Sequence, residues 1–281
     1  MPRQPRSGAS VLLSIVIPSR NRPQCLRRTV AVLIGEIRAH RLEGKIEIIV
    51  ADDASEPPVA VDLSDSIAAG ALRVVRIGRQ SGAAAARNAG VEVSAGEVIA
   101  FLDDDIVPAP DYLRTSLAFH RQHPEVLVVN GNLKPLRDDS YSRFWFHQYD
   151  AAFNRPGGIY PIAMLASGHC SLKRRLLELE RPLFDASLPT REDTDLYLRL
   201  ERHGVQPYKC DAIVAYNDCR NSLLGFVRQY AGYARGQQRL VEKHGSGILR
   251  RAAANPAAPP NWRLAHLYVI LRLVRLLVKA S

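Results

Sequence analysis

The chain has 281 residues, of which 47% are hydrophobic and 23% charged, and this suits a globular protein with a full hydrophobic core. Its net charge of +10 is concentrated at one end, because residues 245–281 contain six Lys or Arg and no Asp or Glu. A nucleic-acid binder more often carries a basic face on its folded body, so we expect no nucleic-acid partner. The four cysteines lack CxxC spacing, which argues against a zinc site and a disulfide framework.

Strands and helices alternate through the first hundred residues. Strands are expected at 12–17, 46–51, 72–77 and 98–102, because each is a short apolar run. One helix is expected from Pro23 to Ile37, with Asn21 as its N-cap, and another from Gly82 to Val93. This alternation predicts an α/β fold with a mostly parallel central sheet and helices on both faces.

The second half of the chain has a weaker pattern. Helices are predicted at 110–123, 192–203 and 223–244, a strand at 126–129, and a linker rich in Ala and Pro at 252–260. Residues 137–168 are rich in aromatic side chains and contain the turn Pro156-Gly157-Gly158. Two interpretations stay open for this segment: a binding surface over the sheet, or a second, smaller core.

Three consecutive carboxylates end one of the apolar runs. Asp103, Asp104 and Asp105 directly follow the strand predicted at 98–102. In open α/β sheets the carboxyl ends of the strands border the ligand crevice. Adjacent carboxylates repel one another unless a cation shares the site, and hard divalent ions such as Mg²⁺ or Mn²⁺ prefer oxygen ligands. The pattern therefore indicates a metal site, and the alternative is a solvated acidic loop.

A second acidic group, Glu192 and Asp193, begins the helix predicted at 192–203. A carboxylate at the mouth of a site can serve as a general base. Acidic residues are also favoured in the first turn of any helix, so capping is the competing explanation.

Two weaker signals lie in the first half of the chain. The small residues from Gly82 to Gly90 can let a helix start approach a diphosphate, with Arg87 as its cation, although close packing of an Ala-rich helix explains them nearly as well. Asp52 and Asp53 end the strand at 46–51, where a carboxylate can accept hydrogen bonds from a base or a ribose, or simply form a turn.

These elements occur together in a recognisable order. From Leu12 to Tyr233 the chain resembles the inverting glycosyltransferase family two, which has the GT-A fold. The resemblance is carried by five blocks of sequence: Ile15-Val16-Ile17-Pro18-Ser19-Arg20-Asn21, Val50-Ala51-Asp52-Asp53-Ala54-Ser55, Ala86-Arg87-Asn88-Ala89-Gly90, Phe101-Leu102-Asp103-Asp104-Asp105 and Glu192-Asp193-Thr194-Asp195-Leu196.

The resemblance implies a role for each candidate residue. It makes Asp103 and Asp105 the acids of an Asp-x-Asp motif, with Asp105 as the direct metal ligand, and Asp193 the general base with Glu192 beside it. The residues that it assigns to donor binding are Pro18, Ser19, Arg20, Asp52, Asp53, Arg87, Asp103 and Asp104. The residues that it places on the acceptor side are Trp145, Gly168 and His169, with the basic run Lys173-Arg174-Arg175 following.

One position departs from the family pattern. Many members carry a His after the strand that follows the Glu-Asp helix, and that His can join the metal shell. Here Ala215-Tyr216-Asn217-Asp218 occupies the place. Either Asn217 or Asp218 substitutes for the His, or the metal keeps an additional water.

The domain organisation follows from the same blocks. Residues 1–244 are expected to form one transferase domain, with a donor half at about 10–132 and an acceptor half at about 133–244. Residues 245–281 are expected to be a basic linker followed by an amphipathic C-terminal helix. The stretch 262–279 is too short and too charged for a comfortable membrane span. It either lies on an anionic membrane surface or packs on the protein with its basic face in water.

The expected activity is transfer of a sugar from a nucleoside diphosphate sugar, with uridine as the base by resemblance only. The acceptor is a hydroxyl of a glycan or a glycolipid, and the cofactor is Mn²⁺ or Mg²⁺. With no evident signal peptide, the expected location is cytoplasmic, with a peripheral site on the inner face of the membrane if residues 261–281 bind lipid. The alternatives are a sugar-nucleotide nucleotidyltransferase and an inactive, membrane-associated homologue or scaffold.

Overall fold

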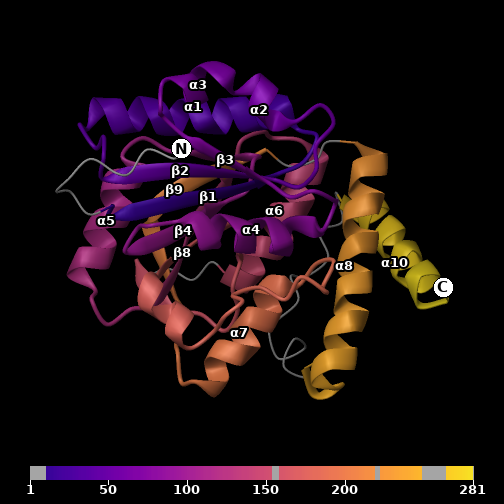
Figure 1. Ribbon diagram of the computed structural model, residues 1–281. Coiled ribbons are helices and arrows are strands. Elements are labelled where there is room, and N and C mark those ends of the chain that lie inside the picture. The colour runs from indigo at the N-terminus through magenta and orange to yellow at the C-terminus, as the bar shows by residue number, and fades with distance from the viewer. Residues whose placement is uncertain (1–10, 154–157, 219–221, 249–263, 281) are drawn as a thin grey trace.

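We describe a computed structural model of the chain, which covers residues 11–153, 158–218, 222–248 and 264–280. A nine-stranded sheet runs through the molecule in the order β3-β2-β1-β4-β8-β6-β9-β5, and β7 pairs with β9 (Figure 1). The strands are β1 (Leu13–Ser19), β2 (Ile46–Asp52), β3 (Arg73–Arg76), β4 (Val98–Leu102), β5 (Ile106–Pro108), β6 (Val128–Pro135), β7 (Ile159–Pro161), β8 (His169–Lys173) and β9 (Tyr208–Asn217).

The sheet is parallel in its first half and mixed in its second. Strands β3, β2, β1 and β4 pair in parallel, with Leu13 opposite Ile46 and Val98. Strand β8 runs antiparallel to both β4 and β6, whereas β6 and β9 are parallel. The carboxyl ends of β1 and β4 therefore meet the amino end of β8, which places His169 opposite Leu102.

Helices cover both faces of the sheet (Figure 1). They are α1 (Pro23–Ala39), α2 (Val59–Asp62), α3 (Ser64–Ala68), α4 (Gly82–Val93), α5 (Tyr112–Gln122), α6 (Ser140–Phe153), α7 (Glu192–Arg202), α8 (Leu223–His244) and α10 (Ala265–Ala280), with a 3₁₀ turn η1 (Arg174–Glu178). Alternate residues of β1 serve different cores, because side chains of a strand point to opposite faces. Leu13, Ile15 and Ile17 pack toward α1, whereas Val16 packs toward α4.

Helix α4 lies against β1 at unusually short range. A Cβ atom added to Gly90 would stand 2.3 Å from Cγ1 of Val16, which is inside any normal contact distance. Of the small residues that precede Gly90 in α4, Ala84 and Ala86 are buried. Close packing of the helix on the strand is thus one use of this small-residue segment.

The aromatic segment at 137–168 contains a helix, α6, that its sequence pattern did not predict. Phe146, Tyr149 and Phe153 of α6 are buried in the core on the α1 side of the sheet. Of the turn predicted at 156–158, the structure describes Gly158, which has a left-handed φ of +74°. These three rings therefore belong to the main core on this face of the sheet and not to a separate, smaller core, while Trp145 is only partly buried.

The C-terminal part of the chain forms two packed helices. A stripe of apolar side chains is buried along α10. It consists of Leu264, just before the helix, and of Leu267, Leu271, Val274 and Val278. Most of this stripe packs against Phe144 of α6 and against Phe226 and Tyr230 of α8. The linker predicted at 252–260 lies outside the described residues. Within the described part of the chain, no helix is both long and apolar enough to cross a membrane.

Candidate active site

A cleft of about 760 Å³ opens at the carboxyl ends of β1 and β4. Among the residues that the sequence assigns to catalysis, to the metal, to the donor and, as Trp145, Gly168 and His169, to the acceptor, only Asp52 does not line it. Those that do are Pro18, Ser19, Arg20, Asp53, Arg87, Asp103, Asp104, Asp105, Trp145, Gly168, His169, Glu192 and Asp193. Residues of α8 and α10 complete the wall, among them Tyr230, Tyr233, Leu271 and Arg275. Segments far apart in the sequence therefore converge on one site.

The three aspartates at the end of β4 are divided between two arginines. Arg22 donates to Oδ1 of Asp104 at 2.6 Å and to Oδ2 of Asp105 at 2.8 Å. Arg87 donates to Oδ1 of Asp103 at 2.6 Å. The guanidinium groups thus offset the repulsion that three adjacent carboxylates create.

Burial strongly affects the acid groups beside Arg22. Desolvation raises the pKa of Asp104 to about 7, although the charge of Arg22 and a hydrogen bond from Ser19 at 2.8 Å pull it down. Desolvation also raises the pKa of Asp105, again against the charge of Arg22. Buried carboxylates of this kind strongly favour a nearby cation.

Sequence reasoning missed Arg22. Its backbone forms the N-cap position of α1, directly before Pro23, which fixes the start of the helix. The sequence does show that Arg22 is a basic residue between the end of a strand and the start of a helix. This position alone does not indicate which carboxylates Arg22 contacts. Arg191 was also missed; it lines the cleft, and its Cζ lies 5.2 Å from the ring centroid of Tyr233.

Arg87 connects the two acidic groups of the sequence. Besides Asp103, it donates to Oε1 of Glu192 at 2.6 Å, and Ser167 donates to the same oxygen at 3.0 Å. Burial by itself lowers the pKa of Arg87, but the charges of Asp103 and Glu192 raise it overall. One buried cation therefore holds the end of β4 and the first turn of α7 on the same cleft.

Asp193 stands next to that ion pair in the first turn of α7. Burial, followed by the charge of Glu192, raises the pKa of Asp193 to about 6. Its Oδ1 accepts a hydrogen bond from the backbone N–H of Thr194 at 2.7 Å, which holds the carboxylate at the helix start. A carboxylate with a pKa of about 6 is suited to general-base chemistry near neutral pH.

The pair that ends β2 is held by backbone contacts. Asp52 is fully buried, accepts from the N–H of Ser55 at 2.9 Å and from Arg76 at 2.5 Å, and lies outside the lining of the cleft. Asp53 accepts from the N–H groups of Ser81 and Gly82 at 2.6 and 3.0 Å, so it satisfies the amino end of α4. Asp53 therefore organises the local backbone, as the turn interpretation expects, and it also lines the cleft.

The acceptor-side candidates differ in their exposure. Trp145 lines the cleft and stacks on Tyr149 with ring centroids 5.0 Å apart. His169 is almost wholly buried, and desolvation lowers its pKa to about 3, so it is neutral. A Cβ added to Gly131 would lie 2.2 Å from Cε1 of His169, so this ring fills the space that the glycine leaves.

Asn217 and Asp218 stand where many family members have a histidine, and the side chain of Asp218 is already paired with arginines. Asp218 pairs with Arg28 at 2.6 Å and with Arg137, and its N–H donates to the carbonyl of Asp105 at 2.9 Å. Asn217 lines the cleft, whereas Asp218 is absent from its lining. Of the two expected substitutes, Asn217 therefore faces the site.

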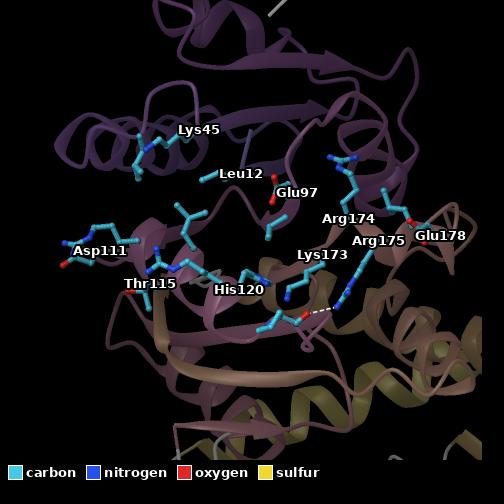
Figure 2. A pocket seen from close by; sticks show the side chains of 18 of the residues that line it. Leu12, Lys45, Glu97, Asp111, Thr115, His120, Lys173, Arg174, Arg175 and Glu178 are labelled. Atoms are coloured by element: carbon cyan, nitrogen blue, oxygen red, sulfur yellow. Dashed lines mark hydrogen bonds and ion pairs between the residues drawn. The ribbon is translucent and has the colours of Figure 1, made fainter. Parts of the chain in front are cut away.

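The basic run that follows the acceptor-side candidates Gly168 and His169 does not line this cleft. A second hollow, of about 1450 Å³, is lined at the opposite end of the strands by Leu12 and Glu97 together with Lys173, Arg174 and Arg175 (Figure 2). The three basic side chains donate to backbone carbonyls there, Lys173 to His123, Arg174 to Gly96 and Arg175 to Pro124. The basic run therefore lies at the end of the strands away from the aspartates.

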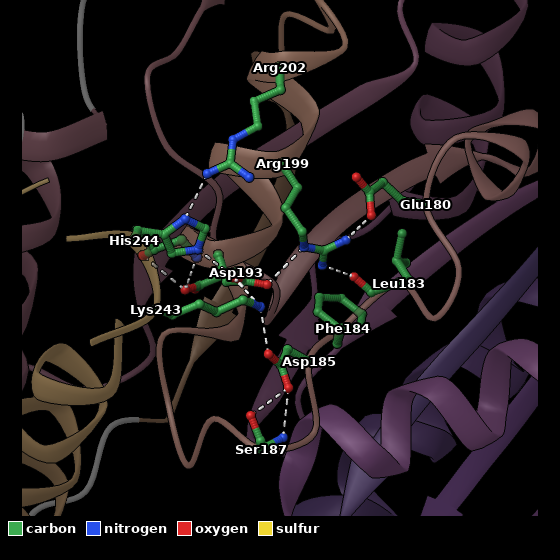
Figure 3. A network of polar contacts seen from close by, with 12 residues as sticks. Glu180, Leu183, Phe184, Asp185, Ser187, Asp193, Arg199, Arg202, Lys243 and His244 are labelled. Carbon is green, nitrogen blue, oxygen red and sulfur yellow. Dashed lines mark hydrogen bonds and ion pairs between the residues drawn. The ribbon is translucent and has the colours of Figure 1, made fainter. Parts of the chain in front are cut away.

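Asp195, the last acid of the 192–195 block, is a structural residue. It is fully buried and accepts from Arg199 at 2.9 Å, from His244 at 2.7 Å and from Lys243 at 2.7 Å. Lys243 also reaches Asp185 at 2.5 Å, and the network continues through Arg199 to Glu180 (Figure 3). The network ties α7 to the carboxyl end of α8 and so supports the helix that carries Asp193.

The residues at the end of β4 have the chemistry of a divalent-cation site. Asp103, Asp104 and Asp105 supply carboxylate oxygens, and burial of Asp104 and Asp105 favours a cation beside them. Among the described residues, however, no three His, Cys, Asp or Glu side chains are grouped as a metal site. In this structure each of the three carboxylates is instead paired with an arginine, Asp104 and Asp105 with Arg22 and Asp103 with Arg87.

Comparisons with known proteins decide the family. A model described as "Glycosyl transferase family 2" matches residues 14–179. The chain belongs to glycosyl transferase family 2. The "Pre-mycofactocin glycosyltransferase" of Mycobacterium tuberculosis is 28% identical over 251 residues, covering 86% of this chain and 50% of that protein. The "Uncharacterized glycosyltransferase YwdF" of Bacillus subtilis is 28% identical over 244 residues, covering 84% of this chain and 85% of that protein. This family-2 chain thus spans half the length of its mycobacterial relative.

Solved structures confirm the GT-A fold predicted for this family-2 chain. The mannosyltransferase PcManGT from Pyrobaculum calidifontis, in complex with GDP-Man and Mn²⁺, is 17% identical with a TM-score of 0.60 over 95% of this chain and 73% of that one. GalNAc-T7 with UDP, GalNAc and Mn²⁺ is 16% identical with a TM-score of 0.59 over 80% and 48% of the respective chains. The α/β class, the helices on both faces of the sheet and the C-terminal helical extension all agree with the prediction.

Proposed function

We propose that this family-2 protein is an inverting glycosyltransferase that moves a sugar from a uridine diphosphate sugar to an acceptor hydroxyl. The observation that carries the proposal is the ion-pair bridge of Arg87, which joins Asp103 at 2.6 Å to Glu192 at 2.6 Å. The bridge brings the candidate metal ligands and the candidate base, Asp193, to one cleft. Family relatives named as glycosyltransferases support the same reaction class.

The donor diphosphate is assigned to the basic end of the cleft. Arg20 lines it, and its Nη1 is buried without a hydrogen-bond partner among the described residues. Arg191 also lines the cleft, and its buried Nε has no hydrogen-bond partner within the described part of the chain. Buried guanidinium nitrogens of this kind favour a polyanionic ligand, because an unsatisfied buried donor is costly. Pro18, Ser19 and Asp53 are assigned to the nucleoside.

A divalent ion, Mn²⁺ or Mg²⁺, would be held by Asp105 with Asp103 and would stabilise the negative charge that develops on the departing diphosphate. Solved relatives of the same fold contain Mn²⁺, which supports this assignment. Asp104 accepts from Ser19 at 2.8 Å and keeps the loop of aspartates against β1. Asn217 lines the same cleft where many family members have a histidine.

The reaction itself is a single displacement. Asp193 accepts the proton of the acceptor hydroxyl as that oxygen forms a bond to the anomeric carbon. The bond from this carbon to the diphosphate oxygen breaks, and the nucleoside diphosphate leaves with the electron pair. Attack from the face opposite the leaving group inverts the configuration. Holding both substrates in line in the cleft supplies much of the rate.

The acceptor is proposed to be a lipid-linked glycan, on the observation that α10 has two different faces. Its inner stripe is buried on α8, and Leu271 and Arg275 also line the cleft. Its outer stripe is apolar and exposed, with Val269, Leu273, Leu276 and Leu277 between 54% and 70% accessible. Arg272 and Arg275 are exposed on the same helix. An apolar stripe beside basic residues is typical of helices that lie on anionic membranes.

This arrangement predicts peripheral attachment to the inner face of a membrane. Replacing both Leu273 and Leu276 by Gln leaves the buried stripe intact, so the variant should fold but lose binding to anionic vesicles in a sedimentation assay. Val61→Gln is the matched control, because Val61 is 65% exposed on α2 and far from α10 in sequence. Arg272→Gln with Arg275→Gln should weaken binding about 30-fold, at about 1 kcal/mol per basic residue. Unchanged binding by both double variants would refute the membrane proposal.

The test of the activity is donor binding. We expect calorimetry with a panel of nucleotide sugars to show binding of one donor with Mn²⁺ present, and loss of that binding in Asp105→Ala. Asp193→Asn should keep the binding and lose transfer. If no donor binds in the presence of metal, the inactive homologue is favoured. Conversion of a nucleotide sugar and pyrophosphate into a nucleoside triphosphate and a sugar 1-phosphate would instead indicate a nucleotidyltransferase.

A further inference from the structure

Arg22 occupies a position between the two aspartates that face the start of α1. Its two terminal nitrogens lie 2.6 Å from Oδ1 of Asp104 and 2.8 Å from Oδ2 of Asp105. The side chain is 29% exposed, whereas those of Asp104 and Asp105 are 5% and 15% exposed. Arg22 is therefore the more accessible partner and can leave, while the carboxylates stay in place.

The aspartate loop is fastened to α1 independently of Arg22. Thr29, fully buried in α1, donates from Oγ1 to the carbonyls of Asp104 and Ile106, both at 3.0 Å. Ser19 donates to the second oxygen of Asp104 at 2.8 Å. The backbone of the loop and the carboxylate of Asp104 are thus held by buried neighbours, so a different cation could take the place of the guanidinium without a rearrangement of the loop.

We propose that Arg22 is a built-in counter-cation of the metal site. In the metal-free protein it neutralises Asp104 and Asp105, and it must release Asp105 when a divalent ion binds. The released guanidinium remains in the cleft beside Arg20, where the donor diphosphate is assigned, and pairs with it. This inference rests on the proposed function and adds a coupling between metal and donor binding.

The coupling has a physical reason. Arg22 and a divalent ion compete for the carboxylate of Asp105, so the metal alone is bound against the loss of the charge-assisted hydrogen bond between Arg22 and that carboxylate. Once a diphosphate is present, the displaced guanidinium regains an anionic partner. Metal and donor therefore favour each other's binding, and reciprocity requires the same factor in both directions.

The test compares Arg22→Gln with the wild type by calorimetry, using MnCl₂ alone and then UDP with saturating Mn²⁺. We expect the variant to bind Mn²⁺ about tenfold more tightly or better, because Asp105 then has no competing guanidinium. It should bind UDP with Mn²⁺ about tenfold more weakly, because the diphosphate loses a cation. Arg27→Gln is the matched control, since Arg27 lies on the same helix and pairs with Asp62 at 3.5 Å. A purely structural role would not produce this opposite pair of shifts.

A measurement on the wild type keeps the proposal testable if Arg22→Gln does not fold. A dicarbonyl reagent that modifies arginines should label Arg22 slowly without metal, faster with Mn²⁺, and slowly again with Mn²⁺ and UDP, as followed by peptide mass spectrometry. The proposal would be overturned if Arg22→Gln bound Mn²⁺ no more tightly than the wild type does. It would also be overturned if Mn²⁺ did not accelerate the labelling of Arg22. Either result would leave the transferase assignment intact. Failure of both proteins to bind Mn²⁺ would overturn the metal requirement in the proposed function, and this inference with it.

Discussion

The contact between Gly168 and Asp103 permits a sharp test of how the site is built. A Cβ atom at Gly168 would lie 2.5 Å from Oδ2 of Asp103 and 3.0 Å from its Cγ, whereas ordinary contacts lie at 3.4–4 Å. Gly168→Ala therefore requires a shift of about 1 Å. Asp103 cannot move freely, because Arg87 holds its Oδ1 at 2.6 Å and its N–H donates to the carbonyl of Gly168 at 3.0 Å.

Two effects of Gly168→Ala follow from this geometry. Overpacking at such a site costs about 1–3 kcal/mol of unfolding free energy, which lowers the melting temperature by roughly 5 °C. A displacement of about 1 Å at the candidate metal ligand Asp103 should reduce the rate of sugar transfer by up to about 100-fold.

Thermal unfolding and initial rates of sugar transfer measure the two effects. Gly78→Ala is the control, because nothing lies within 4 Å of a Cβ at Gly78, and it should be neutral or slightly stabilising. A Gly168→Ala protein with the melting temperature and transfer rate of the wild type would refute the close-packing argument.

Three further predictions concern other parts of the site. Burial raises the pKa of Asp193 to about 6, and a general base must be ionised, so kcat should rise with pH to about 6 and then level off. A flat profile of kcat from about pH 5 to 8 would contradict the assignment of Asp193 as the base. Arg87→Met leaves Asp103 and Glu192 without their shared cation, so urea unfolding should show a loss of about 3–5 kcal/mol, and an unchanged midpoint would argue against the bridge. Asp195→Asn weakens the contacts of α7 with the end of α8, so limited proteolysis should cut near residue 244 sooner than in the wild type, and equal cleavage rates would contradict the role of this network.

The sequence alone was sufficient for the features that depend on neighbouring residues. Apolar runs that end in Asp103 or Asp52 identified strands and the edge of the sheet at which they finish. The acidic start of α7 and the small residues of α4 identified helix termini. Local patterns of this kind determine elements and their polar ends, because burial of one face and capping both act within a few residues.

The aromatic segment shows where local patterns were insufficient. Phe146, Tyr149 and Phe153 pack on the sheet, but their spacing alone did not distinguish a buried helix from an exposed surface. Similarly, the amphipathic pattern of the tail predicted a helix but not which stripe faces the protein. The structure buries Leu267 and exposes Leu273, because α8 and α6 offer an apolar surface to only one side of α10.

Only the tertiary structure decided how the charges of the site are paired. Arg22 meets Asp104 across 82 residues of chain, and Arg87 meets Glu192 across 105 residues. No sequence pattern specifies such partners, since they depend on which strand ends the fold brings together. The chemistry was therefore determined by the residue types in the sequence, and the assignment of each cation to its carboxylates by the topology of the sheet.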